Sequence, residues 1–230
     1  FQYLIRDKDT GFIIGMIGLS SSLSIPLFDR HIGWTREQKW KNYMINHTMN
    51  MSHCVATPPL NQYLTGKLCA LSCRSKEIIR YFESTYNDRA VCWMTTSLFG
   101  KSSVYNRLDG FKYLGNTKGF SAVLIPPEIR EKMRKEYQEK HGKHSEIYTK
   151  SDGTIVKYGT VKTFQKLNKY TKVQRVENLR GVYCIPLAHN YKEFLRGETD
   201  ELQSFEHPTF DELFQYWRQR WCLPRVQRIK

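Results

Sequence analysis

The spacing of apolar residues in the first half of the chain predicts a sheet that begins with a hairpin. Two β-prone runs, residues 2–6 and 12–19, are joined by a polar connection of hairpin length that ends in Gly11. Gly15 and Gly18 within the second run indicate a bulge or a close approach of two backbones. Further short apolar runs bounded by turn residues predict strands at residues 52–57, 90–94, 121–125 and 181–187.

Apolar residues at three- and four-residue spacing predict helices between these strands. Thr35 and Gln38 have the capping-box pattern at the start of a helix over residues 36–47. One face of that helix is expected to be a buried stripe rather than a surface for stacking bases, and it consists of Trp40, Tyr43, Met44 and His47. The longest helical pattern covers residues 61–86. The succession of strands and helices favours an α+β or α/β fold, in which helices flank a mixed sheet.

The second half of the chain has a different character. Residues 128–143 predict a charged surface helix. Residues 150–172 interleave Lys and Thr with aromatic residues, a pattern that suits contacts to phosphates and bases as well as it suits a solvated basic hairpin. Thr209 is expected to cap a helix that ends at Pro224.

The length of the chain limits the number of domains, and its charge indicates the kind of partner. A chain of 230 residues forms one large or two small domains, and we divide it into a core over residues 1–125 and a basic helical and β region over residues 126–230 that packs on the core. Lys and Arg outnumber Asp and Glu by 36 to 22, a net charge of +14 that favours nucleic acid as a partner. No apolar run approaches the roughly twenty residues of a membrane span, so no membrane partner is expected. The chain starts at Phe1 without a methionine, and we expect an N-terminal segment to precede it.

The six cysteines lie mostly in apolar surroundings. This placement indicates reduced core residues in a cytoplasmic protein. Cys69 and Cys73 are one helical turn apart, but no CxxC pair or HxxxH partner accompanies them. We therefore expect no metal site.

The type of side chain changes most often along residues 89–120. This stretch is the candidate functional segment. A buried strand leads into a run of small hydroxyl residues around Gly100, and a short helix over residues 103–108 is expected, with Ser102 or Ser103 as its N-cap. The sequence GKS at residues 100–102 is not a P-loop, because position 95, where that motif needs glycine, is threonine. The segment is either a polar turn that caps a helix or a functional loop at the carboxyl edge of the sheet.

Several motifs together resemble the DruA family of the Druantia anti-phage defence system. The resemblance runs from about residue 12 to residue 225. The motifs that carry it are Gly33-Trp34 with the following REQKWKNYMIN, TTSLFGKSSVYNRL at residues 95–108, YLGNTKGF at residues 113–120, and RGVYCIPLAHNYKEFLRG at residues 180–197. The family has a domain of unassigned function, with relatives near mobile elements.

The predicted order of elements also resembles the GNAT acyltransferase fold, and the central segment resembles the Mom DNA-modification protein of phage Mu. GNAT enzymes hold acetyl-CoA on a loop with a glycine three residues after Gln or Arg. Here Gly66 follows Gln62 by four residues, and Leu68 replaces the second small residue. We therefore expect no acetyl-CoA and no other cofactor. The Mom motif also has an acidic residue after its serine, which Leu98-Phe99 do not supply.

These resemblances imply a DNA-binding component of an anti-phage defence system, with a GNAT-like core that is degenerate as a catalyst. Two alternatives remain open: an enzyme that modifies or cleaves nucleic acid, including one associated with mobile elements, and an assembly subunit that binds an acidic protein. The expected partners are nucleic acid, DNA rather than RNA, and other proteins of the defence system. The candidate site residues are Ser97, Tyr105 and Asn106 for catalysis; Lys101, Ser102, Arg107, Lys157, Lys162 and Lys166 for nucleic-acid binding; and Thr65, Gly66 and Lys67 for phosphate binding.

Overall fold

The computed structural model describes residues 1–98, 100–120, 135, 139, 147–149, 155–157 and 177–229. The chain forms two compact units, one made of Phe1–Thr117 together with Leu179–Lys230 and the other of Lys118–Asn178. Residue 125, the expected end of the core, lies outside the described residues, and the two-part division stays a prediction.

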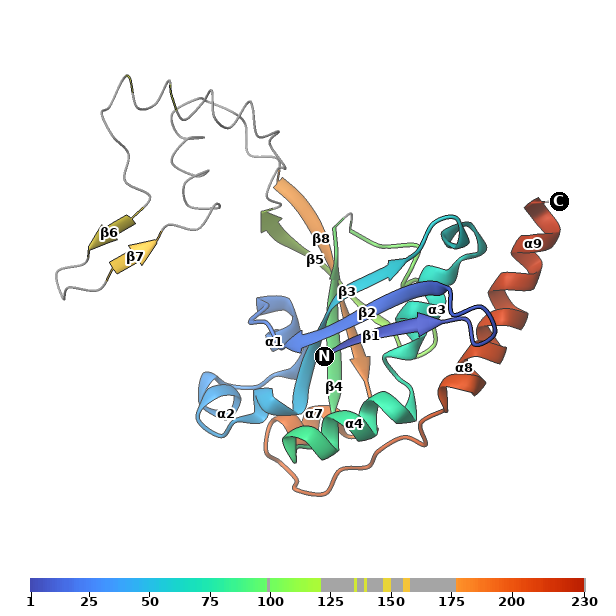
Figure 1. Ribbon diagram of the computed structural model, residues 1–230. Helices are drawn as coiled ribbons and strands as arrows, with labels where there is room; N and C mark the ends of the chain where they lie inside the picture. Colours follow the sequence, from blue (N-terminus) through green and yellow to red (C-terminus); the bar gives the residue numbers. More distant parts are fainter. Residues whose placement is uncertain are drawn as a thin grey trace. The chain divides into compact units, whose positions relative to one another are not determined.

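A six-stranded mixed sheet organises the fold (Figure 1). Its strands follow the order β1-β2-β3-β4-β8-β5. The β3–β4 pair is parallel, whereas β1–β2, β2–β3 and β4–β8 are antiparallel. The strands are β1 (Gln2–Arg6), β2 (Ile13–Ser21), β3 (Thr48–Ala56), β4 (Cys92–Ser97), β5 (Lys112–Phe120) and β8 (Glu177–Pro186). This mixed sheet with flanking helices confirms the predicted α+β class.

The first hairpin forms as its sequence predicts. The β2–β3 register shifts between Gly18 and Leu19, which is the expected bulge. Gly15 allows a close approach, because a Cβ at this position would collide with the thiol of Cys69 and lie 2.6 Å from the carbonyl oxygen of Val55. Both glycines therefore shape the sheet, as their positions within the run indicate.

Hydrophobic side chains fill a core on each face of the sheet. Successive residues of a strand point to opposite faces, so Trp93 and Met94 of β4 enter different cores. The Trp93 core is closed by α3 (Thr65–Ser72), α4 (Lys76–Tyr86) and α8 (Phe210–Trp217), and the Met94 core by α1 (Pro26–Ile32) and α7 (Tyr191–Leu195). The central strand β4 is therefore buried, as expected for residues 90–94.

The prediction of a helix over residues 36–47 is correct only for its first part. Its capping box at Thr35 is present, but the helix α2 (Arg36–Trp40) stops and a 3-10 turn η1 (Met44–His47) follows. Tyr43 between them has a left-handed backbone, with φ of 56°. As a result, Trp40 is 48% and Tyr43 68% exposed. The expectation of a buried stripe is therefore wrong for Trp40 and Tyr43, whereas Met44 and His47 are half-buried.

The long helical pattern over residues 61–86 is divided into three parts. A 3-10 turn η2 (Leu60–Tyr63) precedes α3, and α4 starts anew after Ser75. The hydroxyl of Ser75 accepts a hydrogen bond from the amide of Ile78, so this residue is an N-cap inside the predicted helix. The apolar periodicity was right for α4, which buries one face, whereas α3 is buried on nearly all sides, and a cap restarts the helix between them.

The C-terminal helix starts where it was predicted and ends later. Thr209 and Glu212 form a capping box at the start of α8. The helical run then continues through a π-helical turn η3 (Arg218–Cys222) into α9 (Leu223–Ile229). Pro224 does not end the run, because it stands near the start of α9, where a missing amide costs little after the widened turn.

Two short strands, β6 (Ile147–Thr149) and β7 (Ile155–Lys157), form an antiparallel pair in the second unit. The strand expected at residues 121–125 and nearly all of the helix expected over residues 128–143 lie outside the described residues. Most of the basic stretch over residues 150–172 does so too.

Candidate functional site

The candidate site is the loop after β4, which runs from Ser97 to β5. The hydroxyl of Ser97 donates a hydrogen bond to the carbonyl of Gly100, whose φ is 66°. Gly181 of β8 lies against this carbonyl, and a Cβ there would collide with it. The helix expected over residues 103–108 is wrong: the segment consists of turns, in which the amide of Asn106 donates to the carbonyl of Ser102 at 2.9 Å. Arg107, with φ of 60°, ends this turn.

Tyr183 of β8 fixes the loop through its phenol. The phenol oxygen accepts a hydrogen bond from the amide of Ser102 at 2.8 Å and donates one to the side-chain carbonyl of Asn106 at 3.2 Å. The ring of Tyr105 lies 5.1 Å from that of Tyr183 and stacks on Phe111. Burial raises the pKa of the Tyr183 phenol, so it stays protonated as a donor. The sequence indicated only a strand here, and gave no signal for this role.

Lys67 of α3 holds the loop from the other side. Its side chain is 5% exposed, and its ammonium donates to the carbonyls of Ser103 at 2.6 Å, Val104 at 3.1 Å and Asn106 at 2.9 Å. Burial, and then the charge of Arg107, lower the pKa of Lys67 to about 8. Because three carbonyls surround the three protons of the ammonium, they compensate for its burial.

The predicted phosphate-binding segment therefore has a structural task in this conformation. Thr65 is buried, and its hydroxyl donates to the carbonyl of Leu60 at 3.0 Å. Gly66 is half-buried, and Lys67 directs its ammonium to the loop. The phosphate-binding role of Thr65, Gly66 and Lys67 stays a prediction.

Cations gather around Trp221 of η3, beside the loop. The ring centroid of Trp221 lies 4.4 Å from Nζ of Lys67, 4.8 Å from Cζ of Arg220 and 5.6 Å from Cζ of Arg107. On the same loop, Nζ of Lys101 lies 5.6 Å from the ring of Tyr113. Such cation–π contacts hold a charged group against a ring without neutralising it.

We call Lys101, Arg107 and Arg220 the loop cations. All three side chains are exposed. Within the described part of the chain, no ion pair joins any of them to a carboxylate. The sequence predicted Lys101 and Arg107 as binding residues but missed Arg220 and Trp221, which approach the loop only through the packing of the C-terminal helix. Among the described residues, the positive charge of the loop therefore has no carboxylate paired with it.

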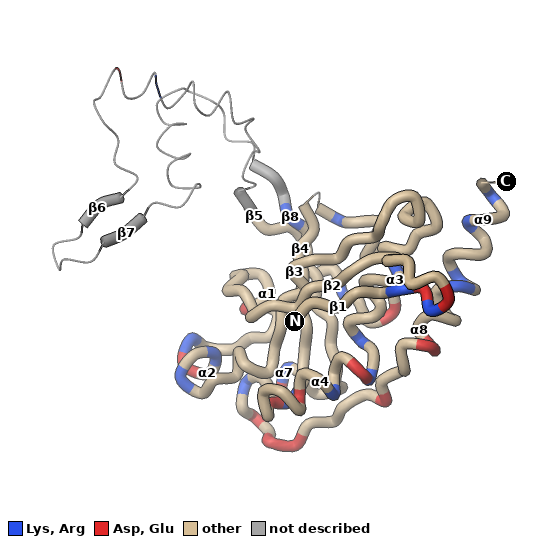
Figure 2. Tube along the Cα trace, in the orientation of Figure 1, with Lys and Arg blue, Asp and Glu red and all other residues tan. Residues whose placement is uncertain are grey.

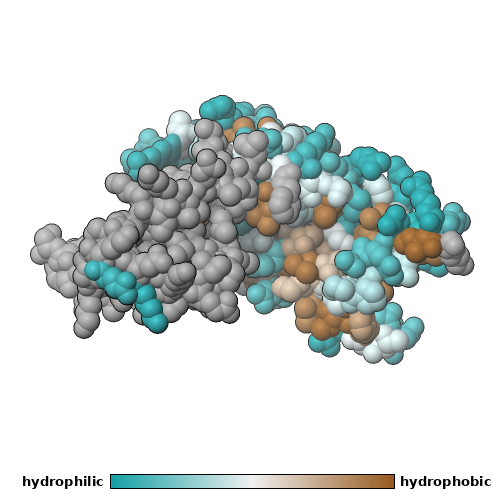
Figure 3. All heavy atoms as spheres, turned by 90° about the horizontal axis from the view of Figure 1, so that it is seen from above, coloured by the Kyte–Doolittle hydropathy of each residue, from teal (hydrophilic) through white to brown (hydrophobic). Residues whose placement is uncertain are grey.

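The surroundings add further charge and exposed apolar groups. Arg225 and Arg228 are exposed on α9, where Figure 2 shows Lys and Arg along the helix. Figure 3 views the molecule from above the orientation of Figure 1. Hydrophobic residues lie at this surface among hydrophilic ones. Leu98, at the start of the loop, is 51% exposed. A mixed basic and apolar surface of this kind suits a polyanion that also offers flat apolar groups.

The predicted catalytic residues all have partners inside the protein. Ser97 donates to Gly100, and Asn106 accepts from Tyr183. Tyr105 is 9% exposed, and burial together with nearby Cys54 raises the pKa of its phenol far above the ordinary value. These contacts favour a role in shaping the loop, and catalysis by Ser97, Tyr105 and Asn106 stays a prediction.

Three of the four remaining predicted binding residues belong to the second unit, and Ser102 belongs to the first. Lys157 is the last residue of β7, and Lys162 and Lys166 lie outside the described residues. Ser102 lies in the loop, where its hydroxyl accepts from the amide of Val104 at 3.2 Å. Nucleic-acid binding by these four residues stays a prediction.

The six cysteines are buried or half-buried. No group of three or more His, Cys, Asp or Glu side chains there is placed to hold a metal ion. All six cysteines are free thiols, and burial raises the pKa of Cys69 to about 11 and that of Cys73 to about 12. These two thiols, one helical turn apart, are core residues, as expected.

In the same described ranges, every helix is too short or too polar to cross a membrane.

Comparisons with known proteins identify the family. The family model described as Druantia protein DruA matches residues 1–197. The curated Druantia protein DruA of Escherichia coli (strain UMEA 4076-1) is 27% identical over 249 residues, an alignment that covers 99% of this chain and 60% of the relative. The chain thus spans about 60% of the length of this relative. No solved structure matches the chain. Because the family model covers most of the chain, the sequence belongs to the DruA family of the Druantia anti-phage defence system.

Proposed function

We propose that this DruA-family chain binds nucleic acid, DNA rather than RNA, as a component of anti-phage defence, and that the loop cations contact the phosphates. One observation carries the proposal: Lys101, Arg107 and Arg220 are exposed beside aromatic rings and have no carboxylate partner in the described residues. Exposed cations without a counterion gain most from a phosphate, because counterion release from the nucleic acid drives the contact.

The architecture of the loop supports this proposal. Lys67 and Tyr183 hold the backbone of residues 102–106 from two sides, so the loop is ordered before a ligand arrives. A fixed loop loses little entropy on binding, which increases affinity. Guanidinium groups that lie against a ring are also oriented before they meet a phosphate.

The charge of the second unit fits the same partner. Its residues, Lys118–Asn178, include 14 of the 36 Lys and Arg but only 7 of the 22 Asp and Glu. Lys157, Lys162 and Lys166 belong to this basic segment. We propose that it adds contacts to phosphates that carry no sequence information.

The order of β1 to β4, with α3 and α4 between β3 and β4, is the one from which a GNAT-like core was inferred. We keep that relationship as part of the proposal, with a core that binds rather than catalyses. Binding through phosphates needs no cofactor. The protein would act in the cytoplasm, together with other proteins of the defence system.

The test measures the affinity for a labelled DNA duplex by fluorescence anisotropy at several salt concentrations. The plot of log affinity against log salt is expected to fall steeply for the wild-type protein. Each of Lys101→Ala, Arg107→Ala and Arg220→Ala should reduce the magnitude of its slope by about 0.9, since each removes one phosphate contact.

A matched control is Arg89→Ala, because Arg89 is exposed and precedes the opposite end of β4. This variant should keep the wild-type slope. If the triple variant of the loop cations keeps that slope as well, the loop is not the binding surface. Equal competition by an RNA duplex would overturn the preference for DNA.

A further inference from the structure

A second surface exposes aromatic residues where the sequence predicted a buried stripe. Trp40 ends α2 with 48% of its surface exposed, and Tyr43 is 68% exposed. Tyr43 adopts a left-handed conformation that is unfavourable for a residue with a Cβ. Backbone strain of this kind clusters at functional sites.

The surface of Trp40 adjoins two hollows. One, of about 560 Å³, is lined by Arg36, Glu37, Trp40 and Lys41. The other, of about 360 Å³, has Trp40 in its wall with Trp34 and the hydroxyls of Ser24 and Thr35 nearby. Both hollows are open to solvent, and Trp40 lines each of them.

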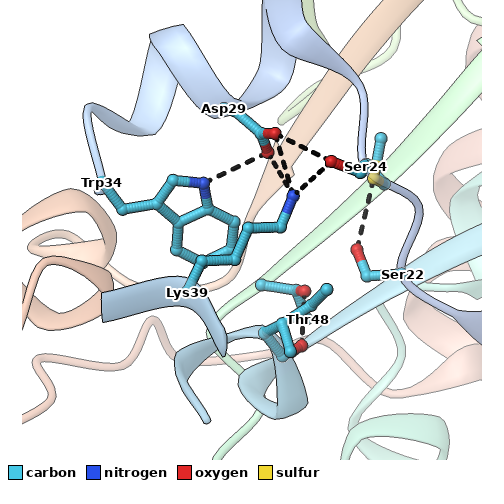
Figure 4. Close-up of polar contacts among 8 residues, drawn as sticks. Ser22, Ser24, Asp29, Trp34, Lys39 and Thr48 are labelled. Atoms are coloured by element: carbon cyan, nitrogen blue, oxygen red, sulfur yellow. Dashed lines mark hydrogen bonds and ion pairs between the residues drawn. The ribbon is translucent and has the colours of Figure 1, made fainter. Parts of the chain in front are cut away.

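An ion pair beneath this surface fixes the position of Trp40. Lys39 is 3% exposed and donates to the two carboxylate oxygens of Asp29 at 2.7 and 2.9 Å, as Figure 4 shows beside the Trp34 ring. Its Nζ lies 5.2 Å from the ring of Trp40 and 5.3 Å from that of Trp34. The Trp40 indole therefore rests on a buried, paired cation rather than moving freely in solvent.

The charges that remain at this surface are positive. Asp29 is paired with Lys39, and Glu37 with Lys41 at 3.1 Å. Arg36 is exposed, and no ion pair among the described residues includes it. An exposed indole next to an uncompensated guanidinium complements a base joined to a phosphate.

We propose that Trp40 and Tyr43 stack on unpaired bases of a single-stranded nucleic acid, while Arg36 contacts its phosphate. The inference rests on the proposed function for the class of ligand, but it concerns a different surface. Helix α2 and η1 precede the amino end of β3, which pairs in parallel with the start of β4, whereas Lys101 and Arg107 follow the carboxyl end of β4 (Figure 1). The chain would thus contact duplex and unpaired segments with different edges of one sheet.

The test compares a single-stranded DNA oligonucleotide with an abasic strand of the same length. Wild-type protein should bind the strand with bases more tightly. Trp40→Ala should weaken that binding about tenfold, because stacking on one ring contributes about this much, and should leave binding of the abasic strand unchanged. Trp40→Phe keeps an aromatic ring and should retain most of the preference for bases.

Controls separate this inference from folding and from the proposed function. Tyr216→Ala removes another exposed aromatic residue, 40% exposed on α8, and should bind both strands as the wild type does. Melting curves show whether each variant folds. Variants of the loop cations should leave the preference for the strand with bases unchanged, because the loop lies at a different edge of the sheet from Trp40.

Two results would overturn the stacking surface. If Trp40→Ala binds both strands as wild-type protein does, the exposed rings belong to a contact with another protein, and only this inference fails. If wild-type protein binds neither strand nor duplex, the proposed function fails together with it.

Discussion

Replacing Asp29 with Ala is expected to lower the free energy of unfolding by about 3 to 5 kcal/mol. Lys39 is 3% exposed, and Asp29, 25% exposed, is its counterion. Without the carboxylate, the buried ammonium keeps only the hydroxyl of Ser24 as a hydrogen-bond partner, and the indole of Trp34 loses its acceptor. Urea unfolding followed by circular dichroism measures the difference.

The exposed pair Glu37–Lys41 on the same helix is a matched control. Both side chains of this pair are largely exposed, so Glu37→Ala should change the free energy of unfolding by no more than about 0.5 kcal/mol. The double variant Asp29→Ala with Lys39→Met should recover much of the lost stability, since it removes the unpaired charge. Wild-type stability of Asp29→Ala alone would show that the buried pair does not hold α1 to α2.

Replacing Lys67 with Met is expected to cost about 3 kcal/mol and to release the loop. Met fills a similar volume, so the change removes mainly three charge-assisted hydrogen bonds to the carbonyls of residues 103, 104 and 106. Those carbonyls then need water, and the backbone of the loop must move to reach it. Binding of DNA should fall although Lys67 itself is buried and its ammonium is bonded to carbonyls of the loop.

Lys76→Met is the control for this change. Lys76 is exposed at the start of α4, and its replacement should alter stability by about 0.5 kcal/mol at most. Amide hydrogen exchange of residues 102–106 reports on the loop directly. Unchanged protection of these amides in Lys67→Met would mean that Tyr183 alone orders the loop.

Local chemistry predicted much of the fold. The capping boxes at Thr35 and Thr209 are present, because a hydroxyl and a residue three positions later suffice to form them. The hairpin of β1 and β2 likewise depends on residues close together in the sequence. The errors came where one pattern continued across a break, at Tyr43 and at Ser75, since periodicity alone does not show where a helix restarts.

The candidate site was only partly predictable. The loop itself was recognisable by its hydroxyl and basic residues, but its supports come from distant segments: Lys67 on α3, Tyr183 on β8 and Trp221 on η3. Their roles depend on how helices pack against the sheet. Apolar periodicity assigned such residues to strands and helices, and no local spacing distinguishes a lysine that binds phosphate from one that binds carbonyls.

Phage restriction tests most directly whether the loop cations are the working surface of this DruA-family protein. The triple variant Lys101→Ala, Arg107→Ala and Arg220→Ala would be compared with Arg89→Ala by plaque counting in a host with the complete defence locus. The free energies of unfolding of the purified proteins, taken from melting curves, should agree within about 0.5 kcal/mol, as expected for exposed positions. We predict that the triple variant loses restriction while Arg89→Ala retains it; normal restriction by the triple variant would contradict a role of this loop in defence.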